Sequence, residues 1–167
     1  MENHEELVQS WLAEEAAPFS GWDFSYLKGR LEDEEIAWSY PHLAREHCKK
    51  ASAVLDIGTG GGEFFSGLAD VLPAKRVATE GYPPNVLVAR QRLEPLGIQV
   101  IDYESGENKS MPFEDSSFDL ILDRHDSFNP LEIERILTPG GVFFTQQVDG
   151  GDLSDLSAAF GAKQPWT

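Results

Sequence analysis

A glycine-rich turn directly after a short apolar segment is the feature that most constrains how this chain can fold. Residues 54–57, Val-Leu-Asp-Ile, have the pattern of a buried strand, and Gly58, Gly60, Gly61 and Gly62 follow at once. Glycine lets the backbone approach a ligand closely because it has no Cβ. In open α/β sheets, ligands lie beyond the carboxyl ends of the strands. The sequence therefore predicts a ligand site at the end of this first strand.

Predicted strands and helices alternate from residue 51 onward. Short runs of β-branched and aromatic residues indicate strands, and apolar residues at helical spacing indicate helices. The alternation predicts an α/β fold, a Rossmann-like, doubly wound and mostly parallel sheet with helices on both faces. Strands are expected at 54–57, 76–80, 98–103, 118–123 and 142–148, and helices at 64–72, 83–93, 131–137 and 152–160.

The first fifty residues have a different pattern. Apolar residues at positions 7, 8, 11 and 12 would share one helix face, an aromatic segment without a clear period follows, and a second helix is expected at 41–50. We therefore expect two parts, a helical and aromatic arm over residues 1–50 and a ligand-binding domain over residues 51–167.

The charge of the chain argues against a nucleic-acid substrate. It has 13 Lys and Arg against 29 Asp and Glu, a formal net charge of -16, and no basic cluster that could hold a phosphate backbone. Its single cysteine, Cys48, excludes an internal disulfide. The N-terminus lacks the pattern of a signal peptide, and no apolar run reaches membrane-spanning length. We expect a cytoplasmic protein that is not inserted in a membrane.

No set of residues predicts a metal site. His42 and His47 are five residues apart, which is not the spacing that places two side chains on one helix face. His4 lies close to the N-terminus. We expect no bound metal.

The spacing of the glycines discriminates between classes of ligand. A dinucleotide-binding turn has the pattern G-x-G-x-x-G, but Glu63 occupies its third glycine position here. A phosphate-binding loop needs a lysine after its last glycine, and none is present. The pattern that fits is D-x-G-x-G-x-G, formed by Asp56, Gly58, Gly60 and Gly62.

Three further motifs follow in order. Glu80 ends the second predicted strand, Met-Pro-Phe-Glu-Asp-Ser-Ser-Phe-Asp spans residues 111–119, and Glu-Ile-Glu-Arg-Ile-Leu-Thr-Pro-Gly-Gly spans residues 132–141. With the glycine turn, these motifs make residues 51–148 resemble the class I S-adenosylmethionine-dependent methyltransferases. The resemblance implies S-adenosylmethionine as the cofactor and the Rossmann-like sheet of that family.

The resemblance also implies which residues hold the cofactor. The turn would approach the methionyl part and the ribose, and Glu80 would accept hydrogen bonds from the ribose hydroxyls. Asp56 would orient the turn or meet the ammonium group through water; alternatively it only caps the turn, and Glu80 is only a solvated acid. The implied cofactor-binding residues are Asp56, Gly58, Thr59, Gly60, Gly62, Glu80, Gly81, Tyr82, Glu104, Ser105 and Arg124.

Several of these positions have a second interpretation. Glu104 and Ser105 follow the third strand and would meet the adenine, but Glu104 could equally be a solvated loop acid. Tyr82 would line the adenine pocket or pack in the core. His125 follows the fourth strand, beside Arg124, and could act as a general base. The alternative is a histidine that only forms a supporting hydrogen bond near the site.

The N-terminal arm could contribute to the same site. By the resemblance, Trp22, Phe24 and Tyr26 could cover the pocket as a lid; alternatively they pack the arm onto the domain. Arg30 could reach the methionyl carboxylate, or it could be a solvated side chain.

The end of the chain departs from the family. The family continues after the fifth strand with a helix and an antiparallel pair of strands, which need roughly forty residues at ordinary lengths. This sequence offers one predicted helix, at 152–160. An open fifth strand would be an unpaired apolar edge, so we expect either a truncated chain or a homodimer formed through that edge.

The sequence therefore predicts a methyltransferase that acts on a small-molecule acceptor. The protein would supply proximity, alignment and exclusion of water, since the cofactor carries an activated methyl group. The alternative is a non-catalytic S-adenosylmethionine-binding domain that serves as a partner subunit. A nicotinamide-dependent oxidoreductase is a third and more distant interpretation.

Overall fold

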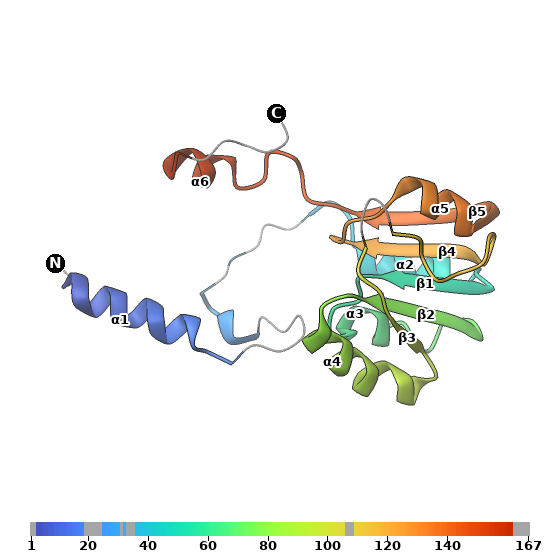
Figure 1. The fold of residues 1–167 in the computed structure, drawn as a ribbon, viewed down its shortest axis with the longest axis horizontal. Helices are drawn as coiled ribbons and strands as arrows, with labels where there is room; N and C mark the ends of the chain where they lie inside the picture. Colours follow the sequence, from blue (N-terminus) through green and yellow to red (C-terminus); the bar gives the residue numbers. More distant parts are fainter. Residues whose placement is uncertain (1–2, 19–24, 31, 33–35, 106–108, 162–167) are drawn as a thin grey trace.

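The core of the computed structural model is a five-stranded sheet in which all neighbours are parallel, in the order β3-β2-β1-β4-β5 (Figure 1). The strands are β1 (Ala53–Ile57), β2 (Lys75–Glu80), β3 (Gln99–Asp102), β4 (Phe118–Arg124) and β5 (Leu137–Gln146). The structure describes residues 3–18, 25–30, 32, 36–105 and 109–161. The chain order reverses between β1 and β4, where α/β sheets bind their ligands.

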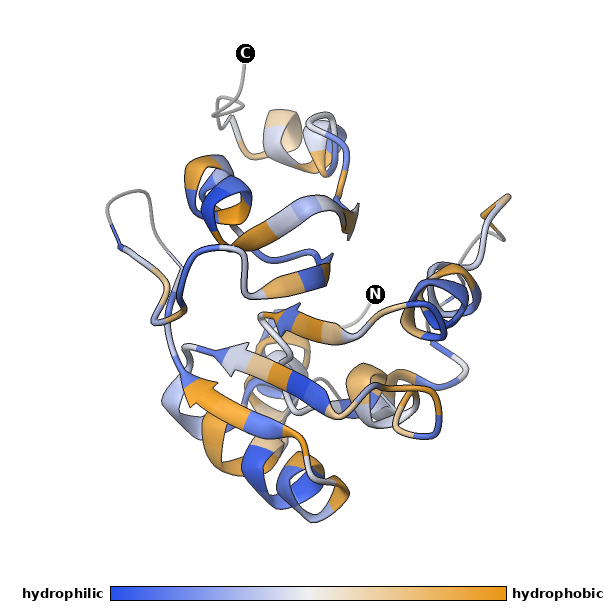
Figure 2. Ribbon diagram, turned by 90° about the vertical axis from the view of Figure 1, so that its right-hand side faces the viewer, coloured by the Kyte–Doolittle hydropathy of each residue, from blue (hydrophilic) through white to orange (hydrophobic). Residues whose placement is uncertain are grey.

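Helices cover both faces of this sheet. One core cluster joins the sheet to α2 (Tyr40–Cys48), α3 (Glu63–Ser66) and α4 (Pro83–Leu93), which a short 3₁₀ turn, η2 (Glu94–Leu96), follows. The other cluster joins the opposite face to α5 (Pro130–Ile136). Neighbouring strand residues divide between the two, as the pleat requires. Hydrophobic residues run through the strands between these layers (Figure 2). The predicted α/β, doubly wound sheet is confirmed.

Two element boundaries differ from the prediction by more than two residues. The helix expected at 64–72 ends at Ser66, because the next residues form i→i−3 hydrogen bonds, such as Val71 N to Leu68 O, in place of the α-helical pattern. The strand expected from Val142 begins at Leu137, which pairs with Phe118. The Pro-Gly-Gly turn bulges out before regular pairing resumes at Val142.

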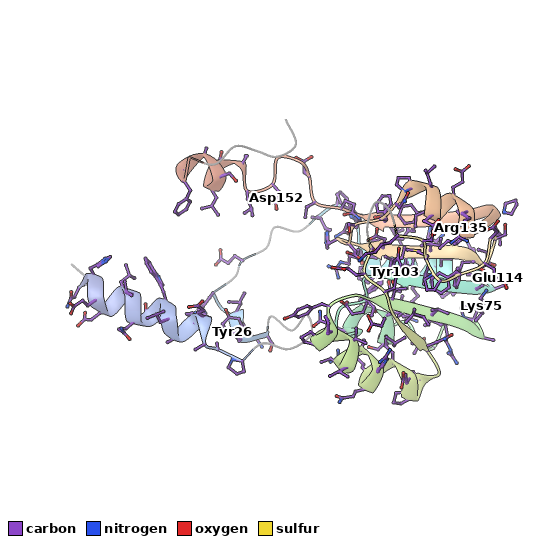
Figure 3. All side chains as sticks on the ribbon, in the orientation of Figure 1. Tyr26, Lys75, Tyr103, Glu114, Arg135 and Asp152 are labelled. Atoms are coloured by element: carbon purple, nitrogen blue, oxygen red, sulfur yellow. The ribbon has the colours of Figure 1, made fainter. Side chains whose placement is uncertain are left out.

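The motifs at residues 111–119 and 132–141 are joined to each other by hydrogen bonds. Arg135 of α5 donates to the carbonyl oxygens of Phe113 and Met111, at 2.7 and 3.1 Å, and to Asp115 Oδ1 at 2.9 Å (Figure 3). Glu132 Oε2 accepts from Met111 N at 2.7 Å. These contacts fix the segment that leads into β4, so the motifs at 111–119 and 132–141 position the sheet rather than form a ligand site.

The terminal segments lie apart from the sheet. The helix α1 (His4–Glu15) has no buried residue, and it projects on the same side of the sheet as α6 (Ser154–Ala159) (Figure 1). A 3₁₀ turn, η1 (Ser25–Leu27), lies between α1 and the domain. By contrast α2, within the predicted arm, packs against the sheet. The division of the chain at residue 50 stays a prediction.

Among the helices that the structure describes, none has both the length and the apolar character needed to cross a membrane. The described residues also contain no group of three or more His, Cys, Asp and Glu side chains placed to hold a metal ion.

Candidate functional site

A cavity of about 1100 Å³ lies at the carboxyl ends of the strands. The loops after β1, β2, β3 and β4 form its walls, together with the beginnings of α2 and α3. His125 and every predicted cofactor-binding residue except Gly62 line this cavity. The structure thus brings together residues that lie up to about seventy positions apart in the chain. Gly62 has another role: it precedes α3 with φ +81°, and a Cβ there would lie 2.8 Å from Leu93.

The glycine turn follows β1, and hydrogen bonds and a left-handed residue fix its backbone conformation. Thr59 N donates to Thr79 O at 2.8 Å, and Gly58 adopts a φ of +61°. A Cβ at Gly58 would lie 2.3 Å from Asp126 Oδ2. Glycine is therefore required at position 58 for two reasons. The backbone is left-handed there, and the carboxylate of Asp126 leaves no room for a Cβ.

Glu80 braces two loops of the cavity. Its side chain is buried, with 7% of its surface exposed, and its two oxygens accept from Gly60 N at 2.7 Å and Tyr82 N at 2.8 Å. The interpretation of Glu80 as a solvated acid is wrong. Each carboxylate oxygen can accept a second hydrogen bond, so this geometry leaves capacity for ribose hydroxyls. That role stays a prediction.

The adenine-side residues lie where β2 and β3 end. A Cβ at Gly81 would lie 2.5 Å from Glu104 Cα, so the two loops touch through their backbones. Tyr82 is 62% exposed, so its interpretation as core packing is wrong. Glu104 is exposed and its carboxylate pairs with Lys109 Nζ at 2.6 Å, which lowers its pKa. Ser105 Oγ lies 3.5 Å from Asp126 Oδ2, at the limit of a hydrogen bond.

Asp56 is a buried acid of the cavity wall, 3% exposed. Burial raises its pKa to about 7, against a lowering by the Thr59 hydroxyl, and the carboxyls of Asp123, Asp126 and Glu80 raise it further. Within the described residues, its carboxyl makes no hydrogen bond to the backbone of the turn. Thr59 Oγ1 is itself buried and makes no hydrogen bond of normal geometry to a described residue.

Two acids of the site were missed from the sequence. Asp123, the last residue but one of β4, is 0% exposed and accepts from Asp126 N at 3.1 Å and from Gln147 Nε2 at 3.2 Å. Its pKa is raised to about 7, mainly by burial. Asp126 is half-buried in the cavity wall, and burial raises its pKa as well. The sequence did contain a pattern that could have indicated them, since Asp123 and Asp126 flank Arg124-His125 at the end of a predicted strand.

His125 is held by a chain of hydrogen bonds. Its φ is +67°, its backbone N donates to Gln146 O at 2.9 Å, and its Nε2 lies 3.3 Å from Gln146 Nε2. Trp38 Nε1 lies 3.2 Å from Gln146 Oε1. Because an indole N–H only donates, it must face the amide oxygen, so the amide NH₂ faces His125 and the imidazole proton is assigned to Nδ1.

This arrangement favours a supporting hydrogen bond for His125. Its Nε2 lone pair accepts from Gln146, and burial with the neighbouring Arg124 lowers its pKa. A neutral imidazole whose free nitrogen is already occupied is a poor general base. The catalytic role of His125 stays a prediction, and Arg124 lies exposed in the cavity wall.

Two of the arm residues predicted for this site, Tyr26 and Arg30, lie outside the cavity lining. Arg30 pairs with Glu14 at 2.6 Å and lies 5.1 Å from the ring centre of Tyr26, so it is a surface side chain of the arm. Tyr26 is 49% exposed and lies far from the sheet, so it does not pack the arm onto the domain (Figure 3). Trp22 and Phe24 are outside the described residues.

Comparisons with known proteins agree with this geometry. A family model described as a methyltransferase domain matches residues 48–165. A probable phthiotriol/phenolphthiotriol dimycocerosates methyltransferase of Mycobacterium ulcerans is 31% identical over 112 residues, covering 62% of this chain and 42% of that protein. A demethylmenaquinone methyltransferase of Deinococcus radiodurans is also 31% identical over 112 residues, covering 62% and 46%. The chain thus spans less than half the length of these relatives.

A solved structure supports the fold. The PH0226 protein of Pyrococcus horikoshii superposes with a TM-score of 0.54 at 25% identity, covering 72% of this chain and 58% of that one. The S-adenosylmethionine-dependent methyltransferase of Mesorhizobium loti, at 16% identity, superposes with a TM-score of 0.55 over 67% of this chain and 55% of that one, which shows likeness of fold alone.

Proposed function

The chain belongs to the methyltransferase-domain family, as its motifs predict, and on that premise we propose that it transfers a methyl group from S-adenosylmethionine to a small-molecule acceptor. S-adenosylmethionine is the cofactor of this family, which agrees with the prediction from the sequence. It supplies an activated methyl group on a sulfonium cation. The observation that carries the proposal is the cavity at the reversal of strand order, lined by the predicted cofactor residues.

The residues of the cavity fit such a ligand. The glycine turn presents its backbone to the cavity at Gly60, and Glu80 has free acceptor capacity beside it. Thr59 offers a buried hydroxyl without a partner among the described residues. A ligand that carries both hydroxyl groups and positive charge suits this combination of acceptors and acids.

We assign the parts of the cofactor along the strand ends. Glu80 would hold the ribose, while Glu104, Ser105, Gly81 and Tyr82 would surround the adenine beyond β2 and β3. The methionyl part would extend toward β1 and β4. It would meet the residues Asp56, Gly58, Thr59, Gly60 and Arg124, with Gly62 supporting the turn through its contact with α4.

A small molecule is the acceptor that the chain favours. The net charge of -16 opposes a nucleic-acid substrate. The names of two relatives describe methyltransferases that act on dimycocerosates and on demethylmenaquinone, neither of which is a nucleic acid. His125 lines the cavity, and with its proton on Nδ1 it would orient the acceptor as a hydrogen-bond donor instead of removing the acceptor's proton.

Binding and turnover test this function separately. Calorimetry should detect binding of both S-adenosylmethionine and S-adenosylhomocysteine. Mass spectrometry should detect methyl transfer to at least one acceptor from a panel of lipids, quinones and amines. Absence of binding would contradict the proposal. Binding without turnover on any acceptor would support the alternative of a non-catalytic domain that serves as a partner subunit. Stabilisation by NADH alone would favour an oxidoreductase.

We also propose that the chain forms a homodimer through β5. This strand is the last of the sheet, so one edge of its backbone has no neighbouring strand among the described residues. Val142 on it is 37% exposed, and unpaired edges of this kind favour association. Light scattering across protein concentrations should give a dimer mass; a constant monomer mass would contradict the proposal.

A further inference from the structure

Four carboxyl groups without a basic partner gather at the cavity: Asp56, Glu80 and Asp126 line it, and Asp123 is buried beside them. Asp56, Glu80 and Asp123 are 3%, 7% and 0% exposed, and Asp126 is half-buried beside them. No Lys, Arg or His among the described residues forms a salt bridge with any of the four. Buried charges in proteins are normally paired, because an unpaired one is poorly solvated. This carboxyl cluster therefore lacks positive charge, and it faces the space that a ligand would fill.

Asp126 has a fixed position within this cluster. Its Oδ1 accepts from Ser127 N at 2.8 Å, and its Oδ2 lies 3.5 Å from Ser105 Oγ. The same Oδ2 packs against Gly58, at 2.3 Å from where a Cβ would be. The carboxylate thus stands where the loops after β1, β3 and β4 meet.

The order of the strands places the cofactor's sulfur near Asp126. In the proposed function, Glu80 holds the ribose at the end of β2, and the adenine lies farther out over β3. The rest of the cofactor must then run the other way along the strand ends, first across β1 and then toward β4. The sulfur is bonded directly to the 5′ carbon of the ribose, so it lies over the β1 turn, where Asp126 meets Gly58.

We infer that Asp126 is the residue by which this site distinguishes the positively charged S-adenosylmethionine from the neutral thioether S-adenosylhomocysteine. The inference rests on the proposed function. Both compounds carry the same adenosine, ammonium and carboxylate groups and differ in the sulfonium charge. A carboxylate at the sulfur, in a partly buried site, attracts only the sulfonium form and therefore favours exchange of the product for fresh cofactor.

The carboxyl cluster also makes the binding of S-adenosylmethionine dependent on pH. Burial, with a further contribution from the nearby Asp126 carboxylate, raises the pKa values of Asp56 and Asp123 to about 7, so both are partly protonated at neutral pH. A bound cation favours their ionised forms, so S-adenosylmethionine should release protons, and its affinity should rise between pH 6 and pH 8. The other titratable groups that face the cluster and the cavity are Tyr40, His42, Arg45, Cys48, Glu63, Glu104, Arg124 and His125.

Calorimetry with both compounds tests the inference. Asp126→Asn keeps the shape of the side chain and removes its charge. We expect S-adenosylmethionine to bind this variant about tenfold more weakly, and S-adenosylhomocysteine within about twofold of the wild-type affinity. The matched control is Asp155→Asn, an exposed aspartate on α6, which should change neither affinity. Equal weakening of both compounds by Asp126→Asn would overturn the inference, since the carboxylate would then act on a shared group.

Measurements on the wild-type protein provide a second test, which does not depend on whether a variant folds. Titrations in buffers of different ionisation enthalpy should show more protons released by S-adenosylmethionine than by S-adenosylhomocysteine at pH 7. Its affinity should also rise more steeply with pH. Equal proton release for the two compounds would overturn the inference while leaving the proposed function intact. If neither compound binds, the proposed function itself fails.

Discussion

The two walls of the cavity use buried acids in opposite ways. On the β2 wall, both oxygens of Glu80 accept hydrogen bonds from backbone N–H groups, of Gly60 and Tyr82. On the β4 wall, Asp126 raises the pKa of Asp123, both raise the pKa of Asp56, and no basic side chain of the described residues pairs with them. The carboxylate of the β2 wall has hydrogen-bond partners before any ligand binds, whereas the carboxyl groups of the β4 wall have no positive charge to balance them.

The two walls therefore have different roles: the β2 wall fixes the conformation of the loops, and the β4 wall provides negative charge. A carboxylate that accepts two N–H groups stabilises the loops that bear them, so the β2 wall holds its conformation with or without a ligand. Crowded carboxyls in a buried site cost free energy when ionised, and a cation can remove that cost. We therefore expect changes in the β2 wall to affect folding and binding together, and changes in the β4 wall to depend on pH.

The largest effect is expected from Glu80→Ala. It leaves the N–H groups of Gly60 and Tyr82 without acceptors, and each unpaired buried group costs about 1–3 kcal/mol. Affinity for S-adenosylmethionine should fall at least about a hundredfold and Tm should drop, as calorimetry and thermal unfolding would show. Glu114→Ala, at an exposed glutamate, is the control (Figure 3). A Glu80→Ala variant with unchanged Tm would show that the wall does not depend on this brace.

The next effect concerns Asp123 and has a definite sign with pH. The folded pKa of about 7 lies above the unfolded value of about 3.9, so this group's contribution to stability is present below pH 4 and is lost as pH rises to about 7. Asp123→Asn removes the titration. Relative to the wild type, its free energy of unfolding should increase by about 2 kcal/mol between pH 5 and pH 8.

Urea unfolding of both proteins at each pH measures this change. Subtracting the wild-type values cancels the pH dependence of groups that Asp123 does not influence, and the lowered pKa of Asp56 in the variant changes the difference in the same direction. A constant difference between the two proteins would mean that Asp123 is ionised at both pH values, and the contrast between the walls would then disappear.

Much of the fold and of the β2 wall could be predicted from the sequence, because local patterns encode them. Alternating apolar segments predicted the parallel sheet, and the glycine turn with Glu80 predicted where the loops meet. The β4 wall was only partly predicted. From the sequence, Asp123 has the pattern of a polar residue at the end of an apolar strand. Its proximity to Asp56, on a different strand, arises only through tertiary packing.

Two other limits have physical causes. The Pro-Gly-Gly turn was predicted, but its inclusion within β5 depends on the pairing of Leu137 with Phe118, a long-range contact. The role of His125 could not be read from its position alone, because it depends on the hydrogen bonds of Gln146 and Trp38.

A smaller effect is expected from Tyr40→Phe, which tests how α2 supports the β4 wall. The Tyr40 hydroxyl lies 3.1 Å from Asp123 O and 3.0 Å from Phe144 O, and its ring stacks on Phe144. Phenylalanine keeps the stacking and loses the hydrogen bond, so stability should fall by about 1 kcal/mol. Tyr26→Phe, in the arm, should have less effect because that side chain is half exposed. Equal losses in urea unfolding would contradict a specific support by Tyr40.

The smallest effect is expected from Trp38→Phe, and it tests the proton position on His125. With the indole N–H removed, the Gln146 amide can turn its oxygen toward the imidazole, where it accepts from the protonated ring. The pKa of His125 should therefore rise by about half a unit, which corresponds to a change of about 0.7 kcal/mol. Nitrogen-15 NMR of the imidazole would report both the pKa and the tautomer, with Trp11→Phe on exposed α1 as the control. A wild-type ring protonated at Nε2 would contradict the assignment and would restore His125 as a candidate general base on the β4 wall.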